Sequence, residues 1–593
     1  MAVSRLDTVD QVTLQVVNNH LVTTTREMGV AMRNTSYSPL FNEGLDFSCA
    51  VFDPGGEMLA QGDFCPSQLG AMKFVVEWTI AEIGIDEFHP GDVVFHNDPY
   101  RGGCHVPEYC VISPIFDGDR LIGFAGNIGH MTETGGKSPG SFPGDSTDIF
   151  QEGIRIPPVK IVEAGRDVPI VWNIIMANVR TPRVSYGDMK ALIGALNIAE
   201  RRVLELVEKY GIDEYLEIAE AVKDYAERRM RAEIAEMPDG VYELEEFICD
   251  NDGLTPEPAK LRLKITIDGD HMTVDYSGSD RQRRGPINCT YGVTAGATYN
   301  ALLHLTDESI PANEGAYRPV RIIAPSGTIM NVEYPGALVG GNSEVHPHIV
   351  MAIYRALSEA IPDRVSAYDG GTSAILTFGG IHPMTGEVFV NLLNDGCGWG
   401  GRATKDGNTC LCIPNGNCAL QAVEVLETRY PISHRALRIW EGSAGAGKNR
   451  GGWGYIREFR IDCDEFTVSM FMERERIPPL GLFGGMNGPT ASVLVSQDGG
   501  RTFRTFGEAF GVACNAKFSG IVLKRGDIIR ETIPGGGGYG SPLERGFERI
   551  EEDLRQGYLS AADAEREYAV VIAPDAVHVD LEATAVRRAA APE

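Results

Sequence analysis

The N-terminal part of the chain alternates between helical and strand patterns of apolar residues. Apolar positions recur at helical spacing from about Val9 to Arg33, and LDFSCAVFD then alternates and turns at PGGE, which predicts a helix followed by a hairpin. The run QLGAMKFVVEWTIAEIG predicts the next helix. GDVVFHND predicts a short strand, and YCVISPIF-DGD-RLIGFAGNIGH predicts a hairpin whose second strand ends at His130.

The pattern changes after about residue 186, where two charged amphipathic helices follow each other over residues 187–236. β-like runs then continue to Gly540, interrupted by helices near 292–305 and 346–361, and a charged helical tail closes the chain. We therefore predict a multi-domain α+β fold with mixed, hairpin-rich sheets. The predicted parts are an N-terminal metal-site domain (1–186), a central helical hairpin (187–237), an α+β domain with glycine-rich loops (238–540) and a C-terminal helical tail (541–593).

Composition restricts the setting of this fold. A chain of 593 residues is too long to fold around a single hydrophobic core. Its 53 Lys and Arg against 82 Asp and Glu give a net charge of −29. This charge argues against nucleic acid or an anionic membrane as a partner. No run of about eighteen apolar residues occurs, and the N-terminus lacks the apolar stretch of a signal peptide, so we expect a cytoplasmic protein.

The cysteines suggest no structural metal site. Twelve cysteines are scattered along the chain, which in a reducing compartment predicts buried thiols rather than disulfides. The only cluster, Cys410, Cys412 and Cys418, does not match the paired spacing of structural zinc sites.

Candidate chemistry concentrates in the stretch HNDPYRGGCHVPEY, residues 96–109. His105 and Glu108 are spaced H-x-x-E with a proline between them, and His130 lies at the end of the neighbouring predicted strand. Asp46 interrupts an otherwise apolar strand, where burial would demand a partner. Two imidazoles with two carboxylates suit Zn, Mn or Fe(II) and leave room for water. The alternative is a hydrogen-bonded core role for each histidine.

Two glycine-rich stretches and a histidine pair invite other interpretations. Gly442-x4-Gly447-Lys448 imitates a phosphate-binding loop, but Asn449 replaces the hydroxyl residue that holds Mg²⁺, and RGGWG does not readily start a helix. IPGGGGYG (533–540) is interpreted as a turn that allows close backbone packing, with a substrate-facing loop as the alternative. His346 and His348 fit either a surface turn at a helix start or a changed substrate site.

Several long motifs in fixed order carry a family resemblance over nearly the whole chain. They are NDPYRGGCHVPE, GHMTETGG, PGSFPGDSTDIFQEGIRIPPVKI, QAVEVLETRYPI, SAGAGKNRGGWG and IPGGGGYG. The chain resembles the hydantoinase B/5-oxoprolinase family, which also includes subunits of acetone and acetophenone carboxylases. The resemblance implies that Asp46, His105, Glu108 and His130 bind the metal.

The resemblance also directs attention to two acids and shows departures from the family pattern. Glu108 stands where Asp is more common, so its carboxylate reaches one methylene further. The histidine that often follows His130 is replaced by Met131, and Glu133 stands where Asp is expected. Proton transfer is usually assigned to this region, so Glu133, together with Asp98 of the first loop, is our candidate catalytic residue.

The implied function is that of one subunit of a two-component enzyme. A hydantoinase A-like ATPase partner would bind ATP and Mg²⁺ and phosphorylate the oxygen of an amide or ketone, and the present chain would complete the reaction at one divalent transition metal (Zn, Mn or Fe). Chain length favours ATP-dependent opening of a hydantoin, oxoproline or other lactam. The alternatives are a subunit of an acetone- or acetophenone-type ketone carboxylase and a non-catalytic scaffold for the ATPase. Each of these predicts a hetero-oligomer.

Overall fold

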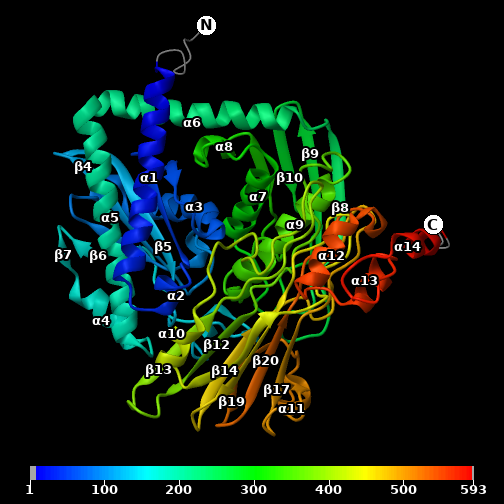
Figure 1. Ribbon diagram of the computed structural model, residues 1–593. Coiled ribbons are helices and arrows are strands. Elements are labelled where there is room, and N and C mark those ends of the chain that lie inside the picture. The colour runs from blue at the N-terminus through cyan, green and yellow to red at the C-terminus, as the bar shows by residue number, and fades with distance from the viewer. Residues whose placement is uncertain (1–8, 590–593) are drawn as a thin grey trace.

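The computed structural model describes residues 9–589, whose strands form four sheets with helices packed around them (Figure 1). The first sheet is antiparallel and has the order β2-β1-β5-β4-β3-β6-β7. Its strands are β1 (Phe47–Phe52), β2 (Met58–Gln61), β3 (Val93–His96), β4 (Glu108–Asp117), β5 (Arg120–His130), β6 (Val159–Glu163) and β7 (Arg166–Asp167). The predicted hairpin ending at His130 is therefore confirmed.

This first sheet lies between two helical layers because its side chains alternate. Phe47, Cys49 and Val51 of β1 belong to the core formed with helices α1 (Gln11–Thr35) and α5 (Pro182–Tyr210), while Ala50 and Phe52 join the core formed with α3 (Pro66–Ile83). Two short helices, α2 (Pro39–Asn42) and α4 (Pro169–Ala177), complete this part of the chain. The helices predicted from residues 9–33 and from QLGAMKFVVEWTIAEIG are confirmed.

The second sheet has the order β11-β10-β9-β8 and packs against helices α7 and α9. The elements of this part are β8 (Gly240–Cys249), β9 (Ala259–Asp268), β10 (His271–Asp275), α7 (Tyr291–Leu305), α8 (Glu314–Tyr317), β11 (Val320–Ile323) and α9 (His346–Leu357). Helix α3 joins the first two parts by packing on α7, where Gly70 and Gly296 meet. A Cβ on Gly70 would lie 2.3 Å from the Cα of Gly296, so only glycine allows this close crossing.

The third and fourth sheets face each other at the bottom of Figure 1 and share one apolar core. The third has the order β13-β12-β16-β19, with bounds Val388–Leu393, Ile375–Ile381, Phe466–Phe471 and Lys517–Leu523. The fourth has the order β14-β15-β20-β17-β18, with bounds Ile432–Ile439, Tyr455–Ile461, Ile528–Ile533, Ser492–Ser496 and Arg504–Thr505. Helices α10 (Val423–Arg429), α11 (Phe506–Phe510), α12 (Phe547–Arg555), α13 (Ala561–Glu567) and α14 (Leu581–Ala589) follow in chain order. The predicted α+β class and helical tail are confirmed.

The predicted central helical hairpin is wrong in its geometry. Both helices exist, but after Gly211 helix α6 (Ile212–Ala235) turns away from α5 and crosses the top of the molecule (Figure 1). Tyr215 and Ile218 of α6 pack in the core that the first sheet forms with α1 and α5, whereas Met230 and Ile234 pack in the core that the second sheet forms with α7 and α9. Because each half of α6 has its own apolar partner, the helix bridges two cores instead of folding back on α5. The domain limits drawn from the sequence stay a prediction.

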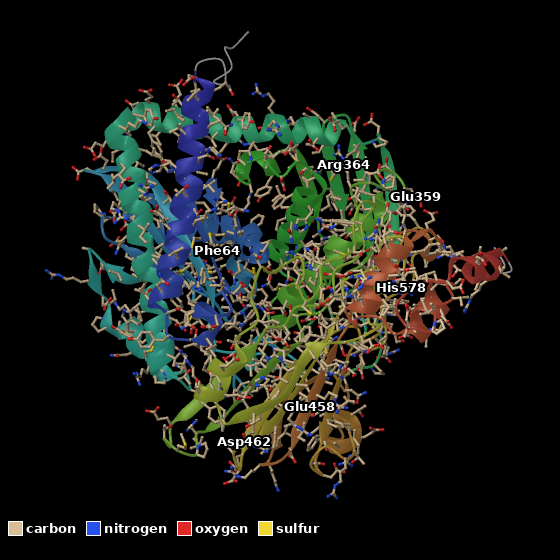
Figure 2. All side chains as sticks on the ribbon, viewed as in Figure 1. Phe64, Glu359, Arg364, Glu458, Asp462 and His578 are labelled. Carbon is tan, nitrogen blue, oxygen red and sulfur yellow. The ribbon has the colours of Figure 1, made fainter. Side chains whose placement is uncertain are left out.

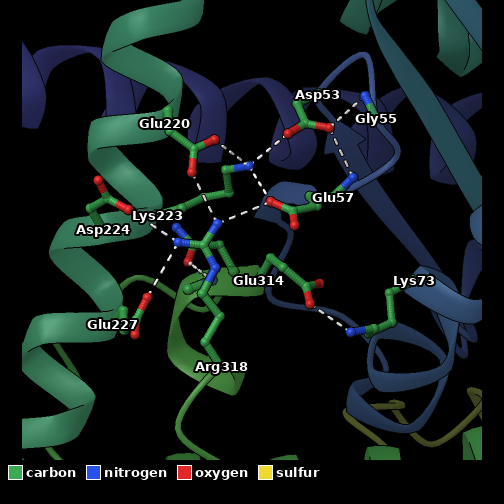
Figure 3. Close-up of polar contacts among 12 residues, drawn as sticks. Asp53, Gly55, Glu57, Lys73, Glu220, Lys223, Asp224, Glu227, Glu314 and Arg318 are labelled. Atoms are coloured by element: carbon green, nitrogen blue, oxygen red, sulfur yellow. Dashed lines mark hydrogen bonds and ion pairs between the residues drawn. The ribbon is translucent and has the colours of Figure 1, made fainter. Parts of the chain in front are cut away.

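A network of ion pairs fixes α6 to its neighbours (Figure 3). Lys223 donates to Asp53 at 2.6 Å, to Glu57 and to Glu220 at 2.7 Å. Arg318, next to α8, pairs with the same Glu220 at 3.0 Å. The three carboxylates lie close enough together to suggest a cation site, but the Lys223 ammonium already occupies the space between them. This cluster is therefore a structural joint.

Removing the ammonium of this joint is expected to destabilise the protein. Lys223 is 1% exposed in its side chain, and Lys223→Met would remove the ion pair of Asp53 and leave Glu57 and Glu220 with Arg318 alone, at a loss of roughly 3 kcal/mol in the free energy of unfolding. The matched control is Arg26→Met, which breaks a pair with Asp63 whose side chains are 56% and 67% exposed. We expect that control to lose under about 1 kcal/mol. Urea unfolding of the two variants makes the comparison, and equal losses would contradict it.

The glycine-rich turns pack backbone against backbone, as predicted for IPGGGGYG. A Cβ on Gly536 would lie 2.1 Å from the carbonyl oxygen of Trp399, and one on Gly538 would lie 2.1 Å from that of Ala446. Lys448 is followed by extended chain up to β15 rather than by a helix, and its ammonium pairs with Glu544 at 3.3 Å. The stretch is thus a packed turn and lacks the helix N-terminus of a phosphate-binding loop.

No helix within residues 9–589 is both long and apolar enough to cross a lipid bilayer.

Candidate metal centre

Three neighbouring strands bring the predicted ligands to one end of the first sheet. Glu108 opens β4 and is paired directly with His130, the last residue of β5. On the other side of β5, the backbone N–H of His130 donates to the carbonyl oxygen of Asp46, just before β1, at 3.0 Å. His105 precedes Glu108 in a turn closed by the N–H of Glu108 on the carbonyl of His105, at 3.1 Å. Strand order and register therefore place His130 between the two acids.

The four side chains form one buried cluster. The rings of His105 and His130 meet edge to face with centroids 4.8 Å apart. Nδ1 of His105 lies 3.9 Å from Oε2 of Glu108, and Nδ1 of His130 lies 4.0 Å from Oδ2 of Asp46. Each of the four residues is between 1% and 4% exposed. The structure thus assembles all four predicted ligands, while metal binding itself stays a prediction.

Burial shifts the pKa of every member of the cluster toward its neutral form. It lowers the pKa of His105 to about 3, and burial together with the neighbouring His105 holds the pKa of His130 well below its usual range. It raises the pKa of Asp46 to about 6 and that of Glu108 to about 8. The imidazoles therefore keep free lone pairs, and the buried carboxylates would gain from a nearby cation.

The protein supplies no such cation within the described part of the chain, where neither Asp46 nor Glu108 forms an ion pair with Lys or Arg. Three buried atoms of the cluster also lack a hydrogen-bond partner, namely Nδ1 of His105, Nε2 of His130 and Oε2 of Glu108. A buried polar atom left unpaired costs roughly 1–3 kcal/mol. Nitrogen and oxygen donors of this kind, uncompensated and close together, fit a divalent transition metal.

An aromatic side chain covers the two imidazoles. The ring of Phe142 lies 5.9 Å from that of His105 and 6.1 Å from that of His130, stacking on the latter at 25°. Phe142 in turn packs edge to face on Phe471 of β16. The third sheet therefore contributes to closing a site that is built on the first sheet.

Glu133, one of the two predicted catalytic acids, organises the loop that carries Phe142. Its Oε1 accepts from the N–H of Gly135 at 2.6 Å and from Arg180 at 2.8 Å, and its Oε2 accepts from the N–H of Gly140 at 3.0 Å. Oε1 is thus engaged twice and Oε2 once, and the carboxylate is buried within its own loop. The contacts give Glu133 a positioning role, and its catalytic role stays a prediction.

Asp98, the other predicted catalytic acid, is engaged in the same way. One carboxylate oxygen accepts from the N–H of Tyr100 at 3.1 Å, and the other is shared by Arg101 and Arg155, the latter at 2.8 Å. These bonds hold the 96–109 loop and neutralise the buried charge of Asp98. A proton-transfer role for Asp98 also stays a prediction.

The carboxamides that surround the cluster have no signal in the sequence pattern. Gln68 and Asn394 each donate to Asp46, and Asn342 donates to Glu108. Asn342 lies in a π-helical turn, Gly341–Val345, of the kind often found at functional sites. Cys418 lies beside these carboxamides, since Nδ2 of Asn394 is 3.5 Å from its sulfur.

His346 and His348 follow that turn as the first residues of α9. Both are buried, at 0% and 2% exposure, so their interpretation as a surface turn is wrong. Nε2 of His346 lies 3.2 Å from Nδ2 of Asn300, while Nε2 of His348 has no hydrogen-bond partner.

The packing at the start of α3 fixes two parts of the site at once. Phe64 lies against α1 and packs on Phe47, with ring centroids 5.0 Å apart (Figure 2). A Cβ on Gly29 of α1 would lie 2.0 Å from the Phe64 ring, so a larger residue there would displace the ring from this position. Phe47 follows Asp46, and Phe64 precedes Gln68 by four residues. The contact between the two rings therefore helps to position both members of the hydrogen bond from Gln68 to Asp46.

Known proteins resemble this chain in sequence or in fold over most or all of their length. The beta chain of a caprolactamase from Pseudomonas jessenii is 32% identical over 99% of this chain and 100% of its own, and the B component of a putative D-/L-hydantoinase from Pseudomonas sp. is 30% identical over 98% of each. The crystal structure of the ATP-dependent caprolactamase from P. jessenii superposes with a TM-score of 0.90 over 98% of this chain and 100% of that one, at 30% identity. A nucleotide-free acetone carboxylase has the same fold, with a TM-score of 0.88 over 98% of this chain and 83% of that one, at 20% identity. The model of the Hydantoinase B/oxoprolinase family matches residues 10–542, and the chain belongs to that family.

Proposed function

We propose that this chain is the metal-dependent subunit of a two-component, ATP-dependent enzyme that opens a cyclic amide such as a hydantoin, oxoproline or another lactam. One observation carries the proposal: two buried carboxylates and two uncharged imidazoles meet on neighbouring strands with no lysine or arginine paired to them among the described residues. The full-length likeness to proteins named as components of a hydantoinase and a caprolactamase supports the reaction class.

Asp46, His105, Glu108 and His130 would hold one divalent transition metal. Zn, Mn and Fe(II) all accept a mixed set of imidazole and carboxylate donors. Such a metal, when bound, acts as a Lewis acid and lowers the pKa of water.

The protein's own residues prepare the site for this chemistry. The low pKa of each imidazole keeps its lone pair available, and the two carboxyl groups, once ionised, would contribute negative charge that no protein cation cancels within the described residues. Phe142 and the loop held by Glu133 exclude bulk water from the imidazole side. Exclusion of water strengthens electrostatic interactions within the site and limits side reactions of an activated substrate.

The ATP-dependent step belongs to the partner in this proposal. Resonance protects an amide from hydroxide, and phosphorylation of its oxygen removes that resonance. Water can then add to the carbon, the C–N bond breaks to release the amine, and a second water displaces phosphate from the resulting acyl phosphate to give the carboxylate. In this chain the one stretch that imitates a phosphate-binding loop is a packed glycine turn without a following helix. A hydantoinase A-like ATPase chain would therefore bind ATP and Mg²⁺, and the two chains would form a hetero-oligomer.

A ketone carboxylase component is the second candidate, favoured by the fold shared with acetone carboxylase. At 20% identity that likeness concerns the fold, whereas the hydrolase-named relatives are 30–32% identical over at least 98% of the chain. A non-catalytic scaffold would have no need for the uncompensated cluster.

Metal analysis tests the proposal directly. Purified protein produced with Zn, Mn and Fe available is expected to contain close to one divalent metal per chain, because the four ligands lie on a preformed, buried framework. Dialysis against a chelator should abolish ATP-dependent ring opening by the complex with its partner, and metal should restore it. Protein that contains no metal and works equally well after chelation would rule the proposal out.

A further inference from the structure

Three carboxamide side chains hold the carboxylates of the candidate metal centre. Nε2 of Gln68 donates to Oδ1 of Asp46 at 3.0 Å, and Nδ2 of Asn394 donates to Oδ2 of the same residue at 3.3 Å. Nδ2 of Asn342 donates to Oε1 of Glu108 at 3.0 Å. The donors come from α3, from the segment after β13 and from the π-helical turn before α9. Three distant parts of the chain therefore converge on two carboxylates.

The chemistry of the partners fixes the orientation of these amides. A carboxylate that binds a metal is ionised and can only accept, which matches the NH₂ groups that Gln68, Asn342 and Asn394 present to Asp46 and Glu108. The carbonyl oxygens of Gln68, Asn342 and Asn394 are buried and have no donor. Asn391 of β13 is also buried with a free carbonyl oxygen, but its NH₂ group donates to the neutral Gln421 at 3.0 Å. Gln68, Asn342 and Asn394 therefore differ from Asn391 in that their NH₂ groups donate to a carboxylate.

A neutral donor orients a carboxylate without cancelling its charge. Some other buried acids are compensated by cations, as in the pairs of Asp395 with Arg457 at 2.6 Å and of Glu133 with Arg180 at 2.8 Å, whereas Glu152 accepts only from Ser146 and backbone N–H groups. A guanidinium at Asp46 or Glu108 would remove the negative charge that attracts a divalent cation. Carboxamides keep that charge, and they fix which carboxylate oxygen faces the imidazoles.

The carboxamides are themselves held in place. Nδ2 of Asn415 donates to the backbone carbonyl of Asn342 at 2.7 Å, and the backbone carbonyl of Asn415 accepts from the N–H of Ser67, beside Gln68, at 2.9 Å. Asn394 is followed by Asp395, which is anchored to the buried Arg457. Residues that only filled space would not need such bracing.

We propose that Gln68, Asn342 and Asn394 are positioning residues that orient the carboxylates of Asp46 and Glu108 toward a divalent metal while leaving their charge intact. This inference rests on the proposed function, because it requires that the cluster binds metal. Part of the affinity for the metal would then come from residues that do not touch the metal.

The test measures the affinity of the full-length chain for Zn²⁺ alone, by competition with a chromophoric chelator. Gln68→Leu, Asn342→Leu and Asn394→Leu are each expected to bind Zn²⁺ about 10- to 100-fold more weakly than the wild type. Asn394→Gln, which keeps a carboxamide, should recover part of that loss. The matched control is Asn391→Leu, which removes a buried carboxamide three residues away and should change the affinity by less than about twofold. Thermal unfolding should show similar losses of stability for Asn391→Leu and Asn394→Leu.

The outcomes separate this inference from the proposed function. Wild-type protein that binds none of Zn²⁺, Mn²⁺ and Fe²⁺ in this assay would overturn both, and a wild type that prefers Mn²⁺ or Fe²⁺ would have its variants compared with that ion. Wild-type protein that binds Zn²⁺, with folded carboxamide variants that bind it equally well, would overturn the inference alone. An equal loss in Asn391→Leu would also overturn it, because the effect would then follow from lost packing. Where a leucine variant does not fold, the alanine variant gives the same comparison.

Discussion

Alanine at His105 or at His130 is expected to remove the metal and to reduce partner-dependent turnover by about 100-fold or more. Each substitution takes away one of two uncharged imidazoles in a buried site, and changes to groups that merely support metal ligands already cost about 10- to 100-fold in many proteins. Metal content by elemental analysis and turnover of the complex with its ATPase partner are the two measurements.

His89→Ala is the matched control for this pair. His89 is exposed, lies on a turn before β3 and takes part in the turn through its backbone N–H, which donates to Asp92 at 2.9 Å. Its imidazole can therefore be removed without touching the cluster, and metal content and turnover should stay at the wild-type level. Equal effects from all three substitutions would mean that the four residues have been wrongly grouped. Normal metal content in His105→Ala would place the ion elsewhere.

The core of this site follows from local sequence patterns. The DGD turn predicts the 108–130 hairpin and brings Glu108 and His130 to the same end of the sheet, but a bulge between Ile115 and Phe116 shifts the register, so that Glu108 lies opposite His130 rather than opposite Gly129. The H-x-x-E spacing then brings His105 to the same end of the sheet. Asp46 also interrupts an apolar strand, and a carboxylate that is buried at such a place needs a partner. The hairpin brings His105, Glu108 and His130 together locally, whereas Asp46 reaches them only through the long-range pairing of β1 with β5.

The surroundings of the site could not be predicted in that way. Asn342 and Asn394 lie 234 and 348 residues from their partners, and a single asparagine in a loop carries no signature of such a contact. The direction of α6 was missed for a related reason. Its amphipathic pattern indicates that α6 has an apolar face. The pattern does not indicate that one half packs in the core of the first sheet and the other half in the core of the second sheet. Contacts between distant segments depend on the assembled cores.

The two candidate functions differ in the co-substrate that they require. In the hydrolase, water provides an oxygen atom of the product. In the carboxylase, bicarbonate activated by ATP provides a carbon atom. Both reactions would use the same metal ligands, so loss of activity in a ligand variant does not distinguish them. Isotopic labels do.

We expect the complex of this chain with its ATPase partner to open a hydantoin, oxoproline or another lactam in an ATP-dependent reaction that needs no bicarbonate. Oxygen from labelled water should enter the new carboxylate, because the metal site would activate water for attack at the phosphorylated amide carbon. The carboxylates of Asp46 and Glu108, which pair with no lysine or arginine among the described residues, are the reason for expecting a metal, and the full-length likeness to a caprolactamase component is the reason for preferring ring opening. Mass spectrometry of the ring-opened product measures the label, and complex assembled with His130→Ala chain serves as the control. Ketone-dependent ATP turnover that fixes labelled bicarbonate into a β-keto acid, with no ring opening across a panel of lactams and hydantoins, would falsify the hydrolase assignment and leave the metal centre in place.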